Sequence, residues 1–242
     1  MAGDFLDIHA HFVYGVDDGA RSEEQMRAML DAASENGVTT LFATSHAAPG
    51  LERFPQEMYA RHLESARDYC RAKGYELNLY PGVELLYNPM LRDAARESGL
   101  PTLADTDWVL MEYLPQTSAK ELETGLEQVA GCGYSILVAH VERYRCLEQR
   151  GLLEKLKARY PIACQMNCST VLEPGSFWQK RRVERWLRKG VIDVIASDTH
   201  NTTSRPVKLR EAYEKLKTDF GEETADRLTG RAGPWKAFRE TL

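Results

Sequence analysis

The chain has 242 residues, a formal net charge of −5 and a hydrophobic content of 43%. This mild acidity argues against a nucleic-acid backbone as the main partner, because proteins that bind nucleic acid usually present a basic surface. No apolar run approaches the roughly 18 residues of a membrane-spanning helix. Asp4 and Asp7 lie where a signal peptide requires positive charge and then an apolar run. We therefore expect a cytoplasmic protein with no nucleic-acid partner and no direct membrane insertion.

The five cysteines are Cys70, Cys132, Cys146, Cys164 and Cys168. They fit a reducing compartment, because their number is odd and no C-x-x-C pair provides a zinc-finger or redox spacing. No arginine stands six residues after any of them, so the usual motif of a cysteine-nucleophile phosphatase is absent. We expect most of these thiols to be small buried hydrophobes.

Short apolar runs alternate with longer amphipathic segments, beginning with a predicted strand over residues 5–9 and a helix over 22–36. Ser22 is expected to cap that helix and Gly37 to end it. Further strands are predicted at 38–44, 76–84 (broken by Pro81-Gly82), 108–112, 134–140, 162–167 and 191–197, and further helices at 55–73, 89–98, 118–131, 147–159, 177–189 and from 205 onward. About seven β–α units with short connections predict a parallel sheet. We expect residues 1–242 to form a single domain.

Candidate metal ligands lie at the carboxyl ends of most of these strands: His9, His46, Glu84, Glu112, His140 and Asp198. In an open sheet, ligands gather at one crevice where the strand order reverses, whereas in a closed barrel all the strand ends point into one mouth. Six strands contributing to one site favour the barrel. The number of strands favours a distorted (β/α)7 TIM-like barrel over an eight-stranded one.

The spacing of the ligands is as informative as their position. His9 and His11 lie two residues apart on a strand end, so both side chains face one side and can bind one metal ion together. Asp198 and His200 repeat this spacing at the last strand. The loop Gly15-Val16-Asp17-Asp18-Gly19 offers a further carboxylate, and we favour Asp17 over Asp18 as the ligand.

Carboxylates are numerous enough to require cations. Asp17, Glu84, Glu112 and Asp198 would repel one another strongly in one mouth, and either glutamate could bridge two metals. We therefore expect two to three divalent metal ions. Imidazole and carboxylate donors without a convincing thiolate suit manganese, iron or zinc better than a soft metal.

The combined motifs resemble a known superfamily. Asp7-x-His9-x-His11, strand-end His46, Gly82-Val83-Glu84, His140-x-Glu142-Arg143-Tyr144 and Asp198-x-His200 are similar to those of the polymerase and histidinol phosphatase (PHP) superfamily. Gly15-Val16-Asp17-Asp18-Gly19-Ala20 and Ala196-Ser197-Asp198-Thr199-His200-Asn201 resemble, within it, the bacterial tyrosine-protein phosphatases of capsular and exopolysaccharide systems. The resemblance runs from Asp7 to about Pro206. The chain departs from the family pattern at Ala47, where relatives often have a second histidine or a basic residue.

The resemblance implies a PHP-type barrel, a trinuclear metal site often supported by manganese, and action on phosphotyrosines in the tail of a partner bacterial tyrosine kinase. It also implies a ligand set for each metal. His9, His11, Glu84 and Asp198 would hold the first metal, Glu84, Glu112 and His140 the second, and Asp17, His46 and His200 the third.

A mechanism follows from such a site. A water between two cations loses a proton more easily and becomes a hydroxide nucleophile that attacks phosphorus in line with the tyrosyl oxygen. Arg143 and Arg205 follow strand-end ligands closely, and their guanidinium groups suit bidentate phosphate binding. We assign these two arginines and Asp18 to the catalytic group.

Other functions remain open at this stage. One is a small-molecule phosphatase of the same superfamily, such as one acting on histidinol phosphate. Others are a PHP-type nuclease, a non-catalytic module, and an amidohydrolase, which often has a bridging lysine where this chain has Glu112. The Pro49–Tyr59 loop could contact a substrate ring, and the basic segment 179–189 could dock an acidic kinase tail, although each could equally be ordinary surface.

Overall fold

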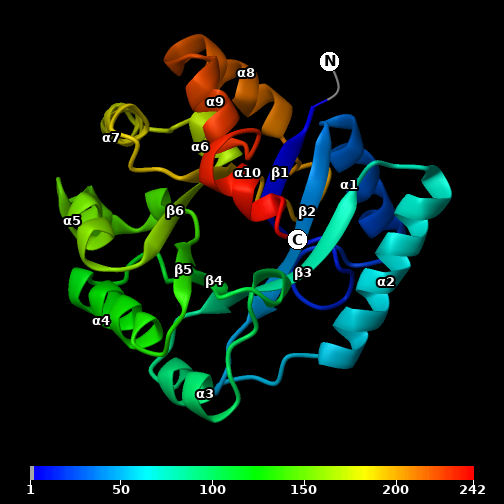
Figure 1. The fold of residues 1–242 in the computed structure, drawn as a ribbon, viewed down its shortest axis with the longest axis horizontal. Coiled ribbons are helices and arrows are strands. Elements are labelled where there is room, and N and C mark those ends of the chain that lie inside the picture. The colour runs from blue at the N-terminus through cyan, green and yellow to red at the C-terminus, as the bar shows by residue number, and fades with distance from the viewer. Residues whose placement is uncertain (1–2) are drawn as a thin grey trace.

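The computed structural model describes residues 3–242 as a parallel seven-stranded sheet that curls into a nearly closed barrel with helices around it (Figure 1). The strands lie in sequential order: β1 (Phe5–Ala10), β2 (Val38–Ala47), β3 (Asn78–Leu86), β4 (Trp108–Glu112), β5 (Ser135–Val138), β6 (Ile162–Asn167) and β7 (Val194–Ala196). The predicted distorted seven-stranded TIM-like barrel is confirmed.

Helices follow the strands on the outside of the barrel. They are α1 (Glu23–Glu35), α2 (Gln56–Lys73), α3 (Leu91–Glu97), α4 (Ala119–Ala130), α5 (Leu152–Arg159), α6 (Cys168–Leu172), α7 (Phe177–Arg188), α8 (Leu209–Phe220), α9 (Glu222–Leu228) and α10 (Gly233–Arg239). Ser22 caps α1 as predicted, because its side chain accepts a hydrogen bond from the Gln25 backbone N–H. No helix among residues 3–242 is long and apolar enough to cross a membrane.

The barrel closes where β7 meets β1. The His11 backbone N–H donates to the Thr199 carbonyl at 2.9 Å, and the Asp198 N–H donates to the His9 carbonyl at 2.9 Å. The buried carboxylate of Asp7 accepts a hydrogen bond of 2.9 Å from the Ser197 backbone N–H. These bonds bring the ends of the first and last strands together, although the two segments are almost 190 residues apart in the chain.

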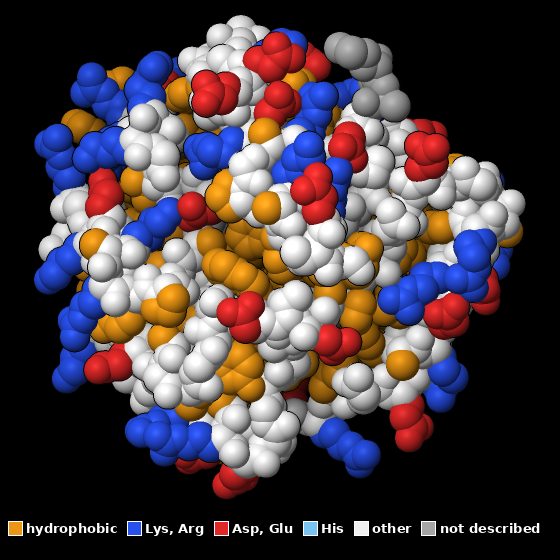
Figure 2. Space-filling model, in the orientation of Figure 1, with side chains coloured by type: hydrophobic (Ala, Val, Ile, Leu, Met, Phe, Trp, Pro, Cys, Tyr) orange, Lys and Arg blue, Asp and Glu red, His pale blue; other side chains and the backbone are white. Residues whose placement is uncertain are grey.

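Apolar side chains fill the barrel and cover its amino end. Leu6, Phe42 and Leu110 point into a buried inner cluster that also contains Trp235 of α10. Figure 1 shows α10 and the C-terminus lying across the middle of the barrel, and hydrophobic side chains surround this point in Figure 2. Because α10 occupies this end, the opening of the barrel lies at the carboxyl ends of the strands.

Strand β3 differs from its prediction, because it continues through Pro81 and Gly82 to Leu86. Proline is tolerated here since the hydroxyl of Tyr59 accepts a hydrogen bond from the Gly82 N–H at 3.0 Å and lies 2.8 Å from the Ala43 carbonyl. Gly82 lies close to a neighbouring side chain, because a Cβ atom there would be 2.8 Å from Cδ2 of the buried Leu103, which would have to shift. The unbroken strand carries Glu84 into the mouth.

Several other boundaries also differ. The helix predicted from residue 147 begins at Leu152, because residues 145–148 form a 3-10 turn. The strand predicted over 134–140 ends at Val138, and the strand predicted from 191 begins only at Val194. Helix α6 was not predicted. It directly follows β6 and so lies at the barrel mouth.

Candidate metal centre

Histidine and carboxylate side chains converge at the carboxyl end of the barrel. Three groups have potential ligand atoms within 4.8 Å of one another: His9, His11, Glu84 and Asp198; His46, Glu84 and Glu112; and His11, Asp18, His46 and His200. Their members lie in the last residues of β1, β2, β3 and β4 or in the segments after β1 and β7, as expected for a mouth formed by parallel strand ends. Seven of the nine residues predicted as ligands belong to these groups, and the other two lie beside them: His140 is 2.8 Å from Glu84, and Asp17 is 2.7 Å from His11.

Glu84 lies at the centre of the cluster. Its Oε2 atom is 3.0 Å from His9 Nε2, 3.3 Å from His11 Nε2 and 3.2 Å from His46 Nδ1. Its Oε1 atom is 2.8 Å from His140 Nε2. Burial alone would raise the pKa of this carboxyl group, but the surrounding histidines hold the pKa well below its ordinary value. Glu84 is therefore placed to act as a bridging ligand.

The remaining pairs link the groups. His46 Nδ1 lies 3.0 Å from Glu112 Oε1, and His140 Nε2 lies 3.7 Å from Glu112 Oε2. Asp198 Oδ1 is 3.5 Å from His9 Nε2 and 3.6 Å from His11 Nε2. At these separations an imidazole nitrogen and a carboxylate oxygen could both bind one divalent cation, whose ligand atoms lie about 2.0–2.2 Å from the metal.

The structure favours Asp18 over Asp17 as the loop carboxylate, which corrects our assignment of these two residues. Asp18 Oδ1 lies 3.2 Å from His200 Nε2 and 3.5 Å from His46 Nε2. Both oxygens of Asp17 are already engaged: Oδ2 accepts from His11 Nδ1 at 2.7 Å and from the His46 N–H at 3.0 Å, and Oδ1 accepts from the Gly19 N–H at 3.0 Å. Asp17 therefore orients His11 by binding Nδ1, the ring nitrogen that does not face Glu84.

This contact also determines the ionisation of His11. Burial would lower the pKa of the imidazole, but the hydrogen bond to Asp17 and the nearby carboxylate of Glu84 raise it to about 10. Burial raises and the His11 hydrogen bond lowers the pKa of Asp17, with a net decrease below its ordinary value. The carboxylates thus attract a positive charge to the position between His11 and Glu84, where a bound cation would serve equally well.

Unsatisfied buried atoms provide the test of fit for metal ions. Glu84 Oε2 and His200 Nε2 are buried and have no hydrogen-bond partner among residues 3–242. Burial, together with His11 and Arg205, lowers the pKa of His200 to about 4, so its imidazole is neutral at pH 7. A neutral imidazole nitrogen in one group and a carboxylate oxygen in the other two, both buried without a hydrogen-bond partner among residues 3–242, are donors suited to divalent cations.

Strand β6 supplies supporting residues that the sequence analysis missed. Gln165 Oε1 accepts from His9 Nδ1 at 3.2 Å and from the His140 N–H at 2.7 Å. Gln165 Nε2 donates to Asn167 Oδ1 at 2.8 Å, and Asn167 Nδ2 donates to Asp198 Oδ2 at 2.8 Å. The available signal was the pair of polar residues two apart in an otherwise apolar strand, since both must face the barrel interior.

The two predicted arginines both reach the cluster. Arg143 Nη2 lies 2.6 Å from Asp198 Oδ2, and Arg205 Nη2 lies 2.7 Å from Asp198 Oδ1. Their side chains are 40% and 36% exposed, so each guanidinium group is open to the mouth. The sixth histidine, His62, stacks on Tyr14 with ring centroids 3.7 Å apart and belongs to none of the three groups.

Comparison with known proteins places this site in a family. The family model described as "Capsular polysaccharide synthesis, CpsB/CapC" matches residues 5–234. The tyrosine-protein phosphatase CpsB of Streptococcus pneumoniae is 30% identical over 230 residues, covering 92% of this chain and 94% of the relative. The corresponding CpsB of Streptococcus agalactiae is 31% identical over 230 residues, with the same coverage.

Solved structures agree with these relatives. A structure from work on YwqE of Bacillus subtilis and CpsB of Streptococcus pneumoniae, described as metal-dependent tyrosine phosphatases, superposes with a TM-score of 0.81 at 25% identity. The match covers 91% of this chain and 89% of that one. A putative histidinol phosphatase from Listeria monocytogenes has a TM-score of 0.54 at 13% identity, covers 89% of this chain and 99% of its own, and shares the fold.

Proposed function

The chain belongs to the CpsB/CapC family and is a metal-dependent tyrosine phosphatase, and we propose that the side chains at its barrel mouth hold the metal ions. The proposed ligands are His9, His11, Asp18, His46, Glu84, Glu112, His140, Asp198 and His200. One observation carries this proposal: Glu84 Oε2 is buried, has no hydrogen-bond partner among residues 3–242, and faces three imidazole nitrogens within 3.3 Å. We propose two to three divalent ions, and manganese as the metal, with iron or zinc as alternatives.

Bound divalent cations would supply Lewis-acid activation of a water nucleophile and neutralise charge on the phosphoryl group. The chain's own residues do the rest. One carboxylate oxygen of Glu84 faces His9, His11 and His46, and the other faces His140. Asp17 holds His11, and Gln165 holds His9, in the required orientation and tautomer. Arg143 and Arg205, half-exposed at the mouth, bind the phosphoryl oxygens and stabilise their charge in the transition state. We therefore assign Asp18 as a metal ligand and no longer as a catalytic residue.

We propose that the substrate is a phosphotyrosine-bearing protein of the capsule system, most simply a bacterial tyrosine kinase. The family's description links it to capsular polysaccharide synthesis, and its relatives carry the name tyrosine-protein phosphatase. We also propose that residues 1–242 act as one catalytic domain, since six of the seven strands provide proposed ligands to one mouth and β6 provides the residues that support them. Five free cysteines, three of them buried, suit the reducing cytoplasm that we propose as its location.

Turnover of a phosphotyrosine peptide, measured beside turnover of histidinol phosphate, tests the function. We expect the peptide to be hydrolysed in the presence of manganese and activity to be lost after exhaustive chelation. Activity on histidinol phosphate alone would replace the proposal with a small-molecule phosphatase. Full activity after chelation would contradict the role of the cluster. His140→Ala, with an unchanged circular dichroism spectrum, should abolish turnover.

A further inference from the structure

Helix α7 presents an exposed surface that the phosphatase site does not use. Residues 177–189 contain six Lys or Arg and one Glu, although the whole chain has a net charge of −5. Phe177 and Trp178 in the first turn are 62% and 75% exposed, more than any other large hydrophobic side chain among residues 3–242. Figure 2 shows Lys and Arg side chains gathering along the edge of the molecule where Figure 1 places α7. Exposed aromatic groups beside such charge are typical of an interaction site.

Most cations of this surface have no carboxylate partner. Arg182 lies 3.4 Å from Glu148, and Lys189 lies 3.3 Å from Glu154. In the part of the chain that the structure describes, the other basic residues of this segment form no ion pair: Lys180, Arg181, Arg185 and Arg188. Arg181 instead lies over the ring of Phe177, with its guanidinium carbon 5.0 Å from the centroid. An uncompensated basic surface attracts an acidic partner.

The surface is continuous with the barrel mouth. Arg182 Nη2 donates to the Glu142 carbonyl at 2.9 Å, and Glu142 directly precedes Arg143, one of the proposed phosphate-binding residues. Helix α7 follows β6 and α6, so its first turn lies on the mouth side. With a rise of about 1.5 Å per residue, Trp178, one turn before Arg182 on the same side of the helix, stands about 6 Å beyond it along the axis, and Phe177 is the next residue outward. A polypeptide that enters the mouth beside Arg143 can therefore extend along Phe177 and Trp178.

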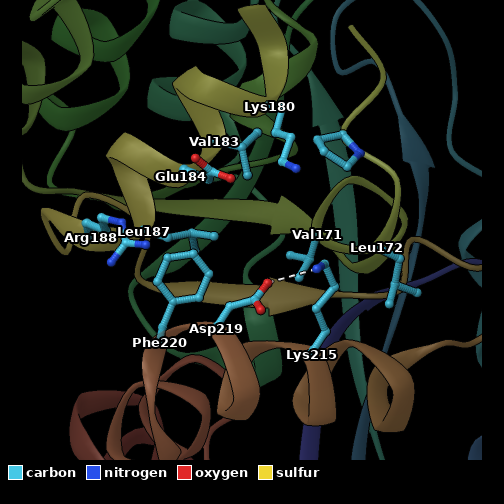
Figure 3. A pocket seen from close by; sticks show the side chains of 11 residues that line it. Val171, Leu172, Lys180, Val183, Glu184, Leu187, Arg188, Lys215, Asp219 and Phe220 are labelled. Carbon is cyan, nitrogen blue, oxygen red and sulfur yellow. Dashed lines mark hydrogen bonds and ion pairs between the residues drawn. The ribbon is translucent and has the colours of Figure 1, made fainter. Parts of the chain in front are cut away.

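A hollow between α7 and α8 borders the same helix (Figure 3). It has a volume of about 370 Å³, and Val183 and Leu187 of α7 and Phe220 of α8 contribute apolar walls. Lys180 and Arg188 project toward it from α7, whereas Lys215 is already paired with Asp219 at 2.8 Å. The hollow thus combines apolar side chains with two cations that form no ion pair among residues 3–242, and the carboxylate of Glu184 also lines it.

We propose that this α7 surface (Phe177, Trp178, Lys180, Arg181 and the α7–α8 hollow) docks an acidic segment of the phosphotyrosine-bearing polypeptide, with an apolar side chain of that segment in the hollow. The proposal rests on the proposed function, because it concerns the substrate of the same mouth. Charge complementarity selects Asp and Glu residues in the segment. A polypeptide is favoured over an anionic membrane because the surface lies next to the barrel mouth, where the phosphotyrosine of the same polypeptide would bind.

Steady-state kinetics with three substrates test this docking. The substrates are a phosphotyrosine peptide flanked by Glu and Asp, the same peptide with Gln and Asn in their place, and phenyl phosphate. For the wild-type enzyme with manganese we expect a KM for the acidic peptide about tenfold below that for the neutral one, rising with ionic strength. Lys180→Glu/Arg181→Glu and Phe177→Ser/Trp178→Ser should each remove most of this difference. In both variants kcat should stay unchanged and phenyl phosphate turnover should change by less than about twofold.

Lys236→Glu is the matched control, because Lys236 is 47% exposed on α10 at the opposite end of the barrel. It should leave all three substrates unaffected. Equal KM values for the two peptides in the wild type would overturn the docking proposal while leaving the phosphatase proposal intact. The docking proposal would also be overturned if the α7 variants lost as much turnover with phenyl phosphate as with the acidic peptide. Binding to phosphatidylserine vesicles that the α7 variants lose, with unchanged peptide KM, would identify a membrane surface instead. Failure of wild-type enzyme on both peptides would count against the phosphatase proposal itself.

Discussion

Substitution of the two adjacent aspartates separates a ligand from a residue that orients a ligand. We compare Asp17→Asn with Asp18→Asn, which remove the same charge from neighbouring positions. Asp17 accepts three hydrogen bonds, and the bond from His11 Nδ1 is 2.7 Å long and buried. An asparagine retains only one acceptor oxygen, so at least one bond is lost and an amide N–H group faces the donors.

The size of the effect follows from the lost bond. A hydrogen bond to a charged group contributes about 1.5–3 kcal/mol. At about 1.4 kcal/mol per factor of ten, loss of this bond should weaken metal binding at His11 by about 10- to 100-fold, the range found when a group behind a metal ligand is removed. Asp18→Asn should instead remove a ligand, so one metal ion should be lost per chain.

Equilibrium dialysis against increasing manganese, followed by elemental analysis, distinguishes the two roles. Asp17→Asn should reach the wild-type metal content at about 10- to 100-fold higher free metal. Asp18→Asn should level off one ion lower. If Asp17→Asn levels off one ion lower and Asp18→Asn reaches the wild-type content, our assignment is reversed and Asp17 is the ligand.

Four further predictions concern the same site and the thiols. Gln165→Leu should weaken metal binding about 10- to 100-fold, because His9 and the His140 backbone both lose their acceptor, and Gln165→Glu should retain more of it. Replacing Arg143 or Arg205 by alanine should lower kcat/KM, and lysine should restore it only in part, since it cannot bind phosphate in a bidentate manner; equal activity of the alanine and wild-type enzymes would contradict this. A metal at about 100 times its dissociation constant adds about 2.7 kcal/mol of stability, so chelation should lower Tm by about 5–11 °C per ion in a differential scanning fluorimetry experiment. A thiol reagent should titrate the two half-buried cysteines, Cys132 and Cys146, in the native protein and all five in denaturant; rapid reaction of all five in the native state would contradict the buried positions of the other three.

The barrel and most of the site could be predicted because their signals are local. A strand followed by a polar side chain appears directly in the sequence at His9, His46 and Glu112, and parallel strand ends must meet at one edge. Adjacent loop residues are different. Asp17 and Asp18 are the same residue type and have nearly the same spacing from His11. Only the path of the loop therefore determines which carboxylate faces the other proposed ligands.

The partners of residues that form hydrogen bonds across strands also could not be predicted from the sequence. Gln165 and Asn167 connect β6 to His9 and Asp198, which come from the two strands that close the barrel. Their contacts span 156 and 31 residues, and no local pattern specifies such partners. The break predicted in β3 at Pro81 was wrong for a related reason. The hydroxyl that accepts the hydrogen bond of the neighbouring Gly82 N–H comes from Tyr59 on another element.

Backbone conformation explains why two strands end earlier than predicted. His140 and Asp198 have positive φ angles of 30° and 51°, a left-handed conformation that costs about 1–2 kcal/mol for a residue with a Cβ atom. Each is held there by a backbone hydrogen bond, from the His140 N–H to Gln165 Oε1 at 2.7 Å and from the Asp198 N–H to the His9 carbonyl at 2.9 Å. The turn ends the strand and directs the side chain toward the centre of the mouth. Histidine and aspartate are enriched among residues with positive φ, but most copies of either do not adopt it. The sequence therefore predicts which side chains reach the mouth but not the strained backbone that directs them there.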